Sequence, residues 1–214
     1  MSDYVIGLTG GIACGKSNLS RALKAAGVPV IDADQISRGL TAPGGKALPA
    51  LREAFGDGVF DGEELNRRAL SDVIFRDEDK RKQLNGILHP MIFQEIRDQL
   101  DAQPGPAVMD VPLLFETGMD AWCDEIWCAY ATQEEQARRL IKREKITRAE
   151  ALRRIHAQMP TREKKKRADH VIRTDGTKEH SAAIVVNLWY GALIRRAERM
   201  RAGQGGGQTS PARR

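Results

Sequence analysis

The chain has 214 residues, of which 41% are hydrophobic and 29% are charged, and its formal net charge at pH 7 is +5. This length is sufficient for one substantial hydrophobic core. No apolar stretch approaches the roughly 20 residues that cross a bilayer, and the first residues lack the pattern of a secretory signal. Three cysteines, Cys14, Cys123 and Cys128, are too few and too odd in number for a disulfide framework. We therefore expect a cytoplasmic protein that does not bind a membrane.

The positive charge is concentrated in two segments. The last twenty residues hold six arginines and one glutamate, which match the net charge of the whole chain. A second excess lies at residues 138–167, where thirteen lysines and arginines stand against three glutamates. Such charge is typical of a nucleic-acid binder and equally of a small basic lid over a polyphosphate. Residues 203–214 are rich in glycine and poor in apolar side chains, and we expect them to be disordered.

The first elements form a strand, a helix and a second strand. Residues 4–9 are an apolar run of strand length. After a glycine-rich segment, helical spacing is shown by Leu19, Ala22, Leu23 and Ala26, and Gly27 ends the pattern. Residues 28–31 are the second strand candidate and lead into Asp32-Ala33-Asp34. This order predicts a βαβ unit with parallel strands.

The middle of the chain, residues 39–103, changes to helical patterns without an obvious buried strand. Leu84, Ile87 and Leu88 form one apolar stripe, and we expect Pro90 to begin a separate helix. Further strands are predicted at 107–110, 125–131 and 170–172, and helices at 133–167 and 178–201, with a capping box at Thr147. About five strands that alternate with helices predict a doubly wound α/β sheet with two helical insertions.

The glycine-rich segment carries a specific motif. Residues 10–17, G-G-I-A-C-G-K-S, match G-x-x-x-x-G-K-[ST] between a predicted strand and a predicted helix. In such a loop backbone N–H groups surround a phosphate, the lysine contacts the β and γ phosphates, and the hydroxyl ligates Mg²⁺. We therefore predict these roles for Lys16 and Ser17. Cys14 is either a small residue that fits the turn or a thiol made reactive by the amide donors around it.

Acidic residues follow the second and third predicted strands, at the sheet edge where the phosphate loop also lies. Strand alternation would turn Asp32 and Asp34 to one face, where one could accept a proton from an attacking hydroxyl and the other hold a metal-bound water. A turn with solvated carboxylates is the alternative. Asp110 could bind the hydration shell of Mg²⁺ or merely cap its strand. The chain has no N-K-x-D tetrad, which argues against a GTPase.

Two arginines in the basic segment, residues 138–167, have the spacing of one helical turn. Arg139 and Arg143 lie four residues apart on a predicted helix, so they face the same way. They could clamp a transferring phosphate. A solvated charged face is the alternative.

Seven segments together carry a family resemblance. They are L-T-G-G-I-A-C-G-K-S, V-I-D-A-D, L-N-R-R-A-L at 65–70, L-H-P at 88–90, D-V-P-L-L-F-E at 110–116, Q-A-R-R-L-I-K-R-E at 136–144 and Q-M-P-T-R-E at 158–163. In this order they extend over nearly the whole chain, which thereby resembles the dephospho-CoA kinases. Phosphate loops are shared by many proteins, but I-D-A-D combined with L-H-P and P-L-L-F-E is specific.

The resemblance implies transfer of the γ-phosphate of ATP to the ribose 3′-hydroxyl of dephospho-CoA, the last step of coenzyme A biosynthesis, with Mg²⁺. It implies a P-loop kinase fold, with a parallel five-stranded sheet and helices on both faces. The nucleotide-binding core would comprise residues 1–38, 104–132 and 168–202, with a helical acceptor-binding insertion at 39–103 and a helical lid at 133–167. ATP and dephospho-CoA would be the partners of a monomer or small homo-oligomer, without nucleic acid.

Site residues follow from the resemblance by position. Asp34 looks like the general base, assisted by Lys16 and Arg143. The predicted contacts to ATP are Gly10, Gly11, Ile12, Ala13, Cys14, Gly15, Lys16, Ser17, Asn18, Arg139, Arg143 and Arg162. The predicted contacts to the acceptor are Asp32, Asp34, Arg67, His89, Leu113 and Glu116. The metal would be held by Ser17 and, through water, by Asp110.

Two positions depart from the family pattern. Asn18 stands where the family often has threonine, and residues 173–176, R-T-D-G, stand where it usually has an asparagine-containing turn, which leaves adenine recognition open. A shikimate or gluconate kinase is an alternative, although those chains are usually shorter and would not need the long helical insertion. An ATP-dependent nucleic-acid-binding protein is a further alternative, and it would bind nucleic acid with a strong salt dependence.

Overall fold

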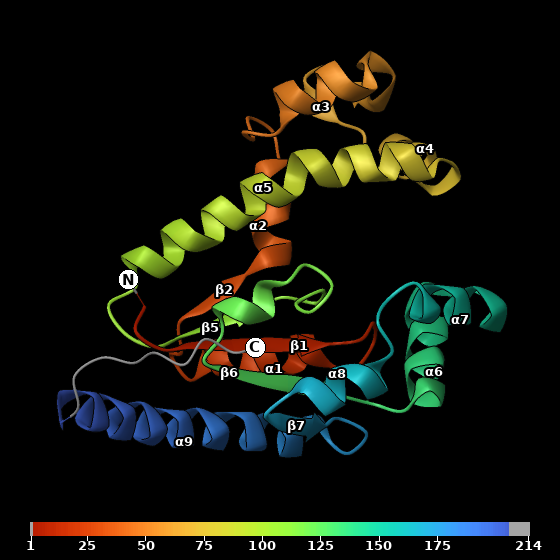
Figure 1. Cartoon of the computed structure of the whole chain (residues 1–214). Coiled ribbons are helices and arrows are strands. Elements are labelled where there is room, and N and C mark those ends of the chain that lie inside the picture. The colour runs from red at the N-terminus through yellow and green to blue at the C-terminus, as the bar shows by residue number, and fades with distance from the viewer. Residues whose placement is uncertain (1, 206–214) are drawn as a thin grey trace. The chain divides into compact units, whose positions relative to one another are not determined.

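A computed structural model describes residues 2–205 (Figure 1). These residues form two compact units, one made of the residues up to Ile31 together with those from Gln103 on, and the other of Asp32–Ala102. The first unit contains most of a five-stranded sheet, and the second is mainly helical. Among the described residues, no helix has both the length and the apolar character needed to cross a membrane.

The five-stranded sheet confirms the predicted fold class. Its strands are β1 (Val5–Gly10), β2 (Val30–Asp32), β5 (Ala107–Asp110), β6 (Glu125–Tyr130) and β7 (His170–Arg173), in the order β2-β5-β1-β6-β7. The central strand β1 pairs in parallel with β5 and β6, so that Leu8 lies opposite both Asp110 and Trp127. All six residues of β1 are buried, as expected for a strand covered on both faces.

Helices cover both faces of this sheet. On one face α1 (Lys16–Ala25) and α9 (Lys178–Gly205) lie side by side. Their buried residues share one core with β1, β6 and β7, which includes Leu19, Leu23, Val185, Trp189, Ile6, Leu8, Trp127 and Ile172. On the other face α8 (Thr161–Arg167) packs against β6 and β1. A short 3₁₀ helix, η2 (Met119–Trp122), follows the turns after β5.

Helix α9 extends beyond its predicted end at residue 201, to Gly205. The expected disorder of residues 203–214 therefore conflicts with the helical backbone of the first three. Residues 206–214 lie outside the described part of the chain.

Residues 133–167, here called the lid segment, also contain α6 (Gln133–Glu144) and α7 (Arg148–His156). The two helices enclose a small apolar core of Ala137, Leu140, Ala151 and Ile155. Each begins at a threonine whose side chain accepts a hydrogen bond from the backbone three residues on: Thr132 from Glu135 and Thr147 from Glu150. The predicted helix start at Thr147 is thus confirmed.

The second unit is mainly helical, and its shorter helices pack against one long helix, α5. Its elements are α2 (Ala33–Leu40), α3 (Leu48–Phe55), the 3₁₀ helix η1 (Asp57–Val59), α4 (Arg67–Arg76) and α5 (Glu78–Ala102). Between η1 and α4 lies a hairpin of β3 (Phe60–Asp61) and β4 (Glu64–Leu65) that the sequence did not predict. Strands of two residues carry too little periodicity to be recognised.

The prediction that Pro90 begins a separate helix is wrong, because α5 runs through it without interruption. A proline inside a helix loses one backbone hydrogen bond and crowds the carbonyl of the preceding turn. Here α5 packs against α2, α3 and α4, and it buries Leu84 before the proline and Ile96 after it. This packing on both sides of Pro90 outweighs the local preference.

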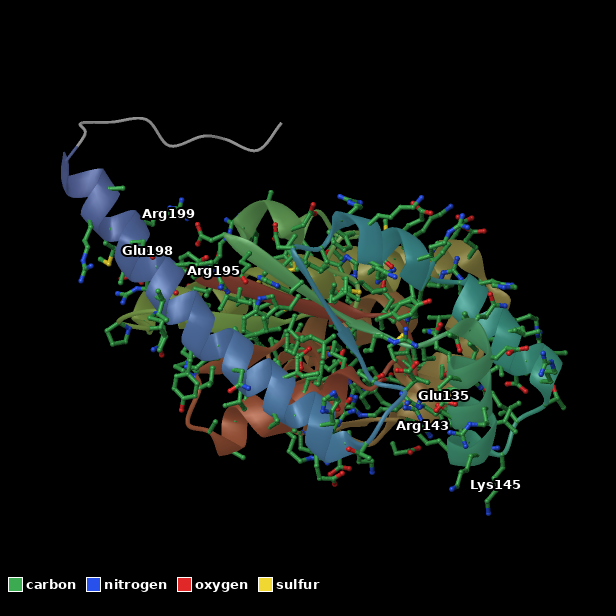
Figure 2. The ribbon with its side chains drawn as sticks, turned by 90° about the horizontal axis from the view of Figure 1, so that it is seen from below. Glu135, Arg143, Lys145, Arg195, Glu198 and Arg199 are labelled. Carbon is green, nitrogen blue, oxygen red and sulfur yellow. The ribbon has the colours of Figure 1, made fainter. Side chains whose placement is uncertain are left out.

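Glu125, the first residue of β6, connects four elements of the first unit. Its carboxylate is 4% exposed and accepts hydrogen bonds from the Tyr4 hydroxyl at 2.9 Å, the Trp127 indole at 2.7 Å and the Arg195 guanidinium at 2.7 and 3.1 Å. The His170 imidazole lies 2.9 Å away. Burial, together with the bond to Glu125, raises the pKa of Tyr4 to about 12. Glu125 therefore joins β1, β6 and β7 to α9, on which Figure 2 labels Arg195.

We predict that Glu125→Gln lowers the free energy of unfolding by about 2–4 kcal/mol, because an amide removes the charge and turns a donor toward other donors. Urea denaturation would show this as a lower midpoint at an unchanged slope. The control is Glu198→Gln on the exposed side of α9, which should change stability by less than about 0.5 kcal/mol. Equal midpoints for the two variants would contradict the assigned role of Glu125.

Candidate active site

The phosphate loop, residues 10–17, lies as predicted between the end of β1 and the start of α1. Gly15 precedes the helix with φ = 82°, a left-handed conformation that glycine adopts without strain. A glycine cannot cap the first turn with a side chain, so an anion can take the place of the cap at the N–H groups of α1. Loop and helix thus form a phosphate-binding arrangement.

Lys16 and Asp110 come together at this edge of the sheet. The Lys16 ammonium forms an ion pair with the Asp110 carboxylate at the end of β5, and both side chains are nearly buried. The register of β1 on β5, with Leu8 opposite Asp110, brings Asp110 next to the loop. Asp110 therefore does more than cap its strand, as it holds the charged group that the motif assigns to the phosphates.

The oxygen atoms near the loop are suited to Mg²⁺. Within residues 2–205, no group of three or more histidine, cysteine, aspartate or glutamate side chains could hold a metal. Magnesium usually keeps several waters and is bound through one or two protein oxygens and the phosphates of a substrate. The Ser17 hydroxyl and the Asp110 carboxylate fit that limited set.

The lid segment approaches the loop closely at Gly11 and Ile12. Gln136 donates a 2.7 Å hydrogen bond to the Ile12 carbonyl, and Gln158 accepts a 2.9 Å hydrogen bond from the Ile12 N–H. A Cβ atom on Gly11 would lie 2.3 Å from the Thr161 hydroxyl and 2.8 Å from the Gln136 amide. The motif allows any residue at position 11, but a side chain there would collide with the lid segment, so its close approach requires glycine. Both glutamines lie in segments that carry the family resemblance, but their position in the sequence indicates no role for them.

Arg139 lies against the loop, where the sequence placed it. Its guanidinium donates to the Ala13 carbonyl at 3.3 Å, to the Thr174 hydroxyl at 3.1 Å and to the Thr174 carbonyl. The Thr174 hydroxyl in turn donates to the Cys14 carbonyl at 2.6 Å. Hydrogen bonds from Arg138 and Arg139 lower the pKa of Glu135 to about 2. Thr174, which the sequence noted only as a departure from the family pattern, therefore connects the loop to Arg139.

The other two predicted arginines point elsewhere. Arg143 pairs with Glu144 and its side chain is 59% exposed, and Figure 2 labels it on α6 near Lys145. Arg162 lies 3.5 Å from Glu163 and is 80% exposed. In the described part of the chain neither guanidinium is hydrogen-bonded to residues 10–17. Their contacts to ATP stay predictions.

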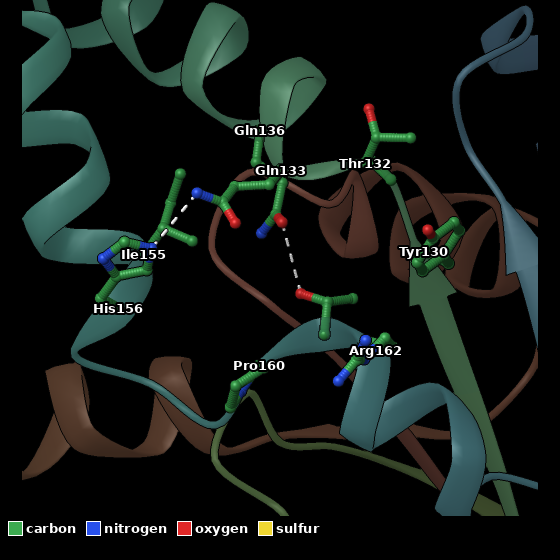
Figure 3. A pocket seen from close by; sticks show the side chains of 10 residues that line it. Tyr130, Thr132, Gln133, Gln136, Ile155, His156, Pro160 and Arg162 are labelled. Carbon is green, nitrogen blue, oxygen red and sulfur yellow. Dashed lines mark hydrogen bonds between the residues drawn. The ribbon is translucent and has the colours of Figure 1, made fainter.

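Arg162 lines a cavity of about 400 Å³ between α6, α7 and α8 (Figure 3). Its walls are formed by the start of α6, the end of α7 and the start of α8, and they include Tyr130, Gln133, Gln136 and His156. Gln133 and His156 interact at 3.2 Å across it. Gln136 thus faces this cavity and the phosphate loop at once.

Asp32 and Asp34 do not alternate along a strand, so the prediction that strand alternation turns both side chains to one face is wrong. Strand β2 ends at Asp32, whose side chain accepts a 3.1 Å hydrogen bond from the Gln35 N–H and thereby begins α2. Asp34 lies in the first turn of α2. Aspartate favours this capping position because its carboxylate satisfies a free N–H of the first turn. The assignment of Asp34 as the base stays a prediction.

Two predicted acceptor contacts belong to the second unit. The Arg67 guanidinium at the start of α4 donates to the Thr41 hydroxyl at 2.9 Å and to the Arg38 carbonyl at 3.3 Å. His89 stacks on Phe93, one turn along α5, with 5.7 Å between the ring centres. Hydrogen bonds to the C-terminal end of α2 thus hold the Arg67 guanidinium.

The other two, Leu113 and Glu116, lie in the turns after β5. Glu116 accepts hydrogen bonds from the Met159 N–H at 3.0 Å and from the fully buried Lys164 ammonium. Lys164 also donates to the Pro112 carbonyl at 2.7 Å. In this structure Glu116 therefore joins the turns to the lid segment, a structural role that the sequence did not indicate.

Cys14 fits the less reactive of its two interpretations. It is 1% exposed, and burial raises the pKa of its thiol. Its sulfur lies 3.7 Å from the Thr161 hydroxyl, under α8. Cys14 is thus a packing residue of the loop, and the alternative of a reactive thiol is not supported.

A family model for dephospho-CoA kinase matches residues 4–180. The chain belongs to the dephospho-CoA kinase family. It is 44% identical over 181 residues to a dephospho-CoA kinase of Shouchella clausii, covering 82% of this chain and 92% of that protein. It is 42% identical over 181 residues to a dephospho-CoA kinase of Geobacillus kaustophilus, covering 82% and 90%.

A solved structure from Thermus thermophilus shares the architecture. It superimposes with a TM-score of 0.76 at 31% identity, and the match covers 89% of this chain and 98% of that one. The family match extends over both units and the whole lid segment. Membership in the dephospho-CoA kinase family thus accounts for the long helical insertion, which the shikimate and gluconate kinase alternatives would not need.

We predict that Gly11→Ala weakens ATP binding about tenfold, because overpacking costs about 1–3 kcal/mol and here displaces Thr161 and Gln136 from the loop. Equilibrium titration with ATP would measure the loss. Gly39→Ala on α2 is the control, since a Cβ there meets no atom within 4 Å. A folded Gly11→Ala protein with unchanged affinity would show that the lid segment does not constrain the loop.

Proposed function

We propose that this protein transfers the γ-phosphate of ATP to the ribose 3′-hydroxyl of dephospho-CoA, giving coenzyme A and ADP. The observation that carries the proposal is the family match, which extends from the phosphate loop through the whole of Asp32–Ala102. The loop geometry supports the ATP half of the reaction. The segments L-N-R-R-A-L and L-H-P resemble those of the dephospho-CoA kinases, which supports dephospho-CoA as the acceptor.

The ATP phosphates are held by the N–H groups of residues 13–17 and by the N-terminus of α1. Lys16, whose ammonium is paired with Asp110 at the loop, contacts the β and γ phosphates. Arg139, already hydrogen-bonded to Ala13 and Thr174, adds positive charge beside the loop. Ser17 and, through water, Asp110 would hold Mg²⁺, which would supply positive charge against the negative charge of the phosphates.

On the acceptor side, Asp34 takes the proton of the 3′-hydroxyl as that oxygen attacks the γ-phosphorus. Arg67 and His89 contact the acceptor, and the guanidinium of Arg67 suits its phosphates. Arg143 and Arg162 approach ATP when the lid segment closes, which excludes water as a competing acceptor. We further propose that the protein works in the cytoplasm as a monomer or small homo-oligomer, without nucleic acid.

The proposed acceptor can be tested directly. We predict that ADP release from ATP rises strongly with dephospho-CoA and stays near the background rate with shikimate, gluconate or AMP. A coupled assay for ADP would measure it, and mass spectrometry would identify the product. No increase with dephospho-CoA would overturn the proposed function.

We predict that Asp34→Asn lowers kcat by at least about a hundredfold and leaves ATP affinity nearly unchanged, because it removes only the base. Asp98→Asn on the exposed side of α5 is the control and should retain full activity. Single-turnover kinetics and ATP titration separate the two effects. If ATP affinity falls together with kcat, Asp34 holds metal or structure rather than a proton.

A further inference from the structure

Both backbone polar groups of Ile12, in the middle of the phosphate loop, are bound by side chains of the lid segment. The Ile12 N–H donates to Oε1 of Gln158 at 2.9 Å, and Nε2 of Gln136 donates to the Ile12 carbonyl at 2.7 Å. Gln136 is a buried residue of α6, 2% exposed, and Gln158 follows α7. The hydrogen bonds of one loop residue are thus made by α6 and by the segment after α7, both far along the chain.

Each amide has a defined orientation. The oxygen of Gln136 accepts a 3.4 Å hydrogen bond from the Thr161 hydroxyl, which directs its NH₂ group toward the loop (Figure 3). Gln158 must present its oxygen, because its partner is an N–H group. Toward Ile12, Gln136 is therefore the hydrogen-bond donor and Gln158 the hydrogen-bond acceptor.

Apolar packing strengthens the same connection. Ile12 and Ala13 pack against the small core of the lid segment, which contains Leu140 and Ile155. Ala13 has φ = 59°, a conformation uncommon for alanine that must be imposed by its surroundings. The loop conformation is thus determined jointly with α6 and α7.

We propose that Gln136 and Gln158 are positioning residues that hold the phosphate loop in its ATP-binding conformation. This role rests on the proposed use of ATP, and it goes beyond the residues that contact substrates. The N–H groups of residues 13–17 must converge on one phosphate, and displacements of about 1 Å are enough to reduce rates a hundredfold. Holding Ile12 at both polar groups restrains the start of that run.

The first test removes each hydrogen bond. Gln158→Leu and Gln136→Leu should each weaken ATP binding about tenfold, the effect of one hydrogen bond and its unsatisfied partner. Gln133→Leu is the matched control, because Gln133 contacts His156 rather than the loop. Titration with ATP alone measures the affinity, and thermal unfolding checks the fold. Gln158 is only partly buried, so its variant serves if Gln136→Leu does not fold.

The second test uses the direction of the bonds. Gln158→Glu keeps an acceptor for the Ile12 N–H, whereas Gln136→Glu sets a carboxylate against the Ile12 carbonyl. Both variants add the same charge, so their difference reports the orientation. We expect Gln158→Glu to bind ATP better than Gln158→Leu, and Gln136→Glu to bind it worse than Gln136→Leu. A merely structural role would not produce this opposite order.

The proposal is overturned if the folded Gln158→Leu protein binds ATP within about twofold of the parent, or if Gln136→Glu binds ATP as well as Gln158→Glu. The ATP titrations need no acceptor. If dephospho-CoA were not phosphorylated while the leucine variants lost ATP affinity, the proposed function would fail and the role of the glutamines would stand. If the parent protein phosphorylated dephospho-CoA normally while the leucine variants kept their ATP affinity, the proposed function would stand and the role of the glutamines would fail.

Discussion

The central strand β1 is hydrogen-bonded on both sides, and the position of the phosphate loop depends on this pairing. β5 fixes one edge of the strand and β6 the other, so the point at which β1 ends is set by two neighbours. The register with β5 brings Asp110 beside the loop, where it binds Lys16. Side chains of both faces are buried along the whole strand, which makes a shift of register costly. A rigid strand thus begins the part of the chain that must hold a phosphate.

Three charged side chains of the first unit are buried or nearly buried, and each is paired with oppositely charged or polar groups. Glu125, at the far end of β6, has its hydrogen bonds fully supplied by fixed donors and serves the fold. Lys164, on α8 of the lid segment, is completely buried, and its ammonium is bound by Glu116 and the Pro112 carbonyl in the turns after β5. Lys16, which is nearly buried, pairs with Asp110 at the end of β5. A buried charge is tolerated only where its partners satisfy it. Of the three charges, only Lys16 belongs to the motif of the phosphate loop.

The lid segment is not simply a cover beside the nucleotide site. Its glutamines and α8 lie directly on Gly11 and Ile12, so the conformation of the loop and the packing of the lid segment are coupled. Arg139 of α6 and Thr174, which follows β7, bind the loop at the carbonyls of Ala13 and Cys14. In this arrangement the glycines serve two purposes, since Gly15 allows a left-handed turn and Gly11 allows another part of the chain to approach closely.

The sequence by itself determined the α/β class, the phosphate loop between β1 and α1, and the family. These depend on local patterns and on the order of short characteristic segments along the chain. Local patterns did not reveal that α5 continues through Pro90, where packing along the helix outweighs a local preference. They placed Asp32 and Asp34 on a strand, although the carboxylate of Asp32 begins a helix. Only the tertiary structure decided that Gln136, Gln158 and Thr174 bind the loop, since hydrogen bonds between residues more than a hundred positions apart leave no periodicity in the sequence.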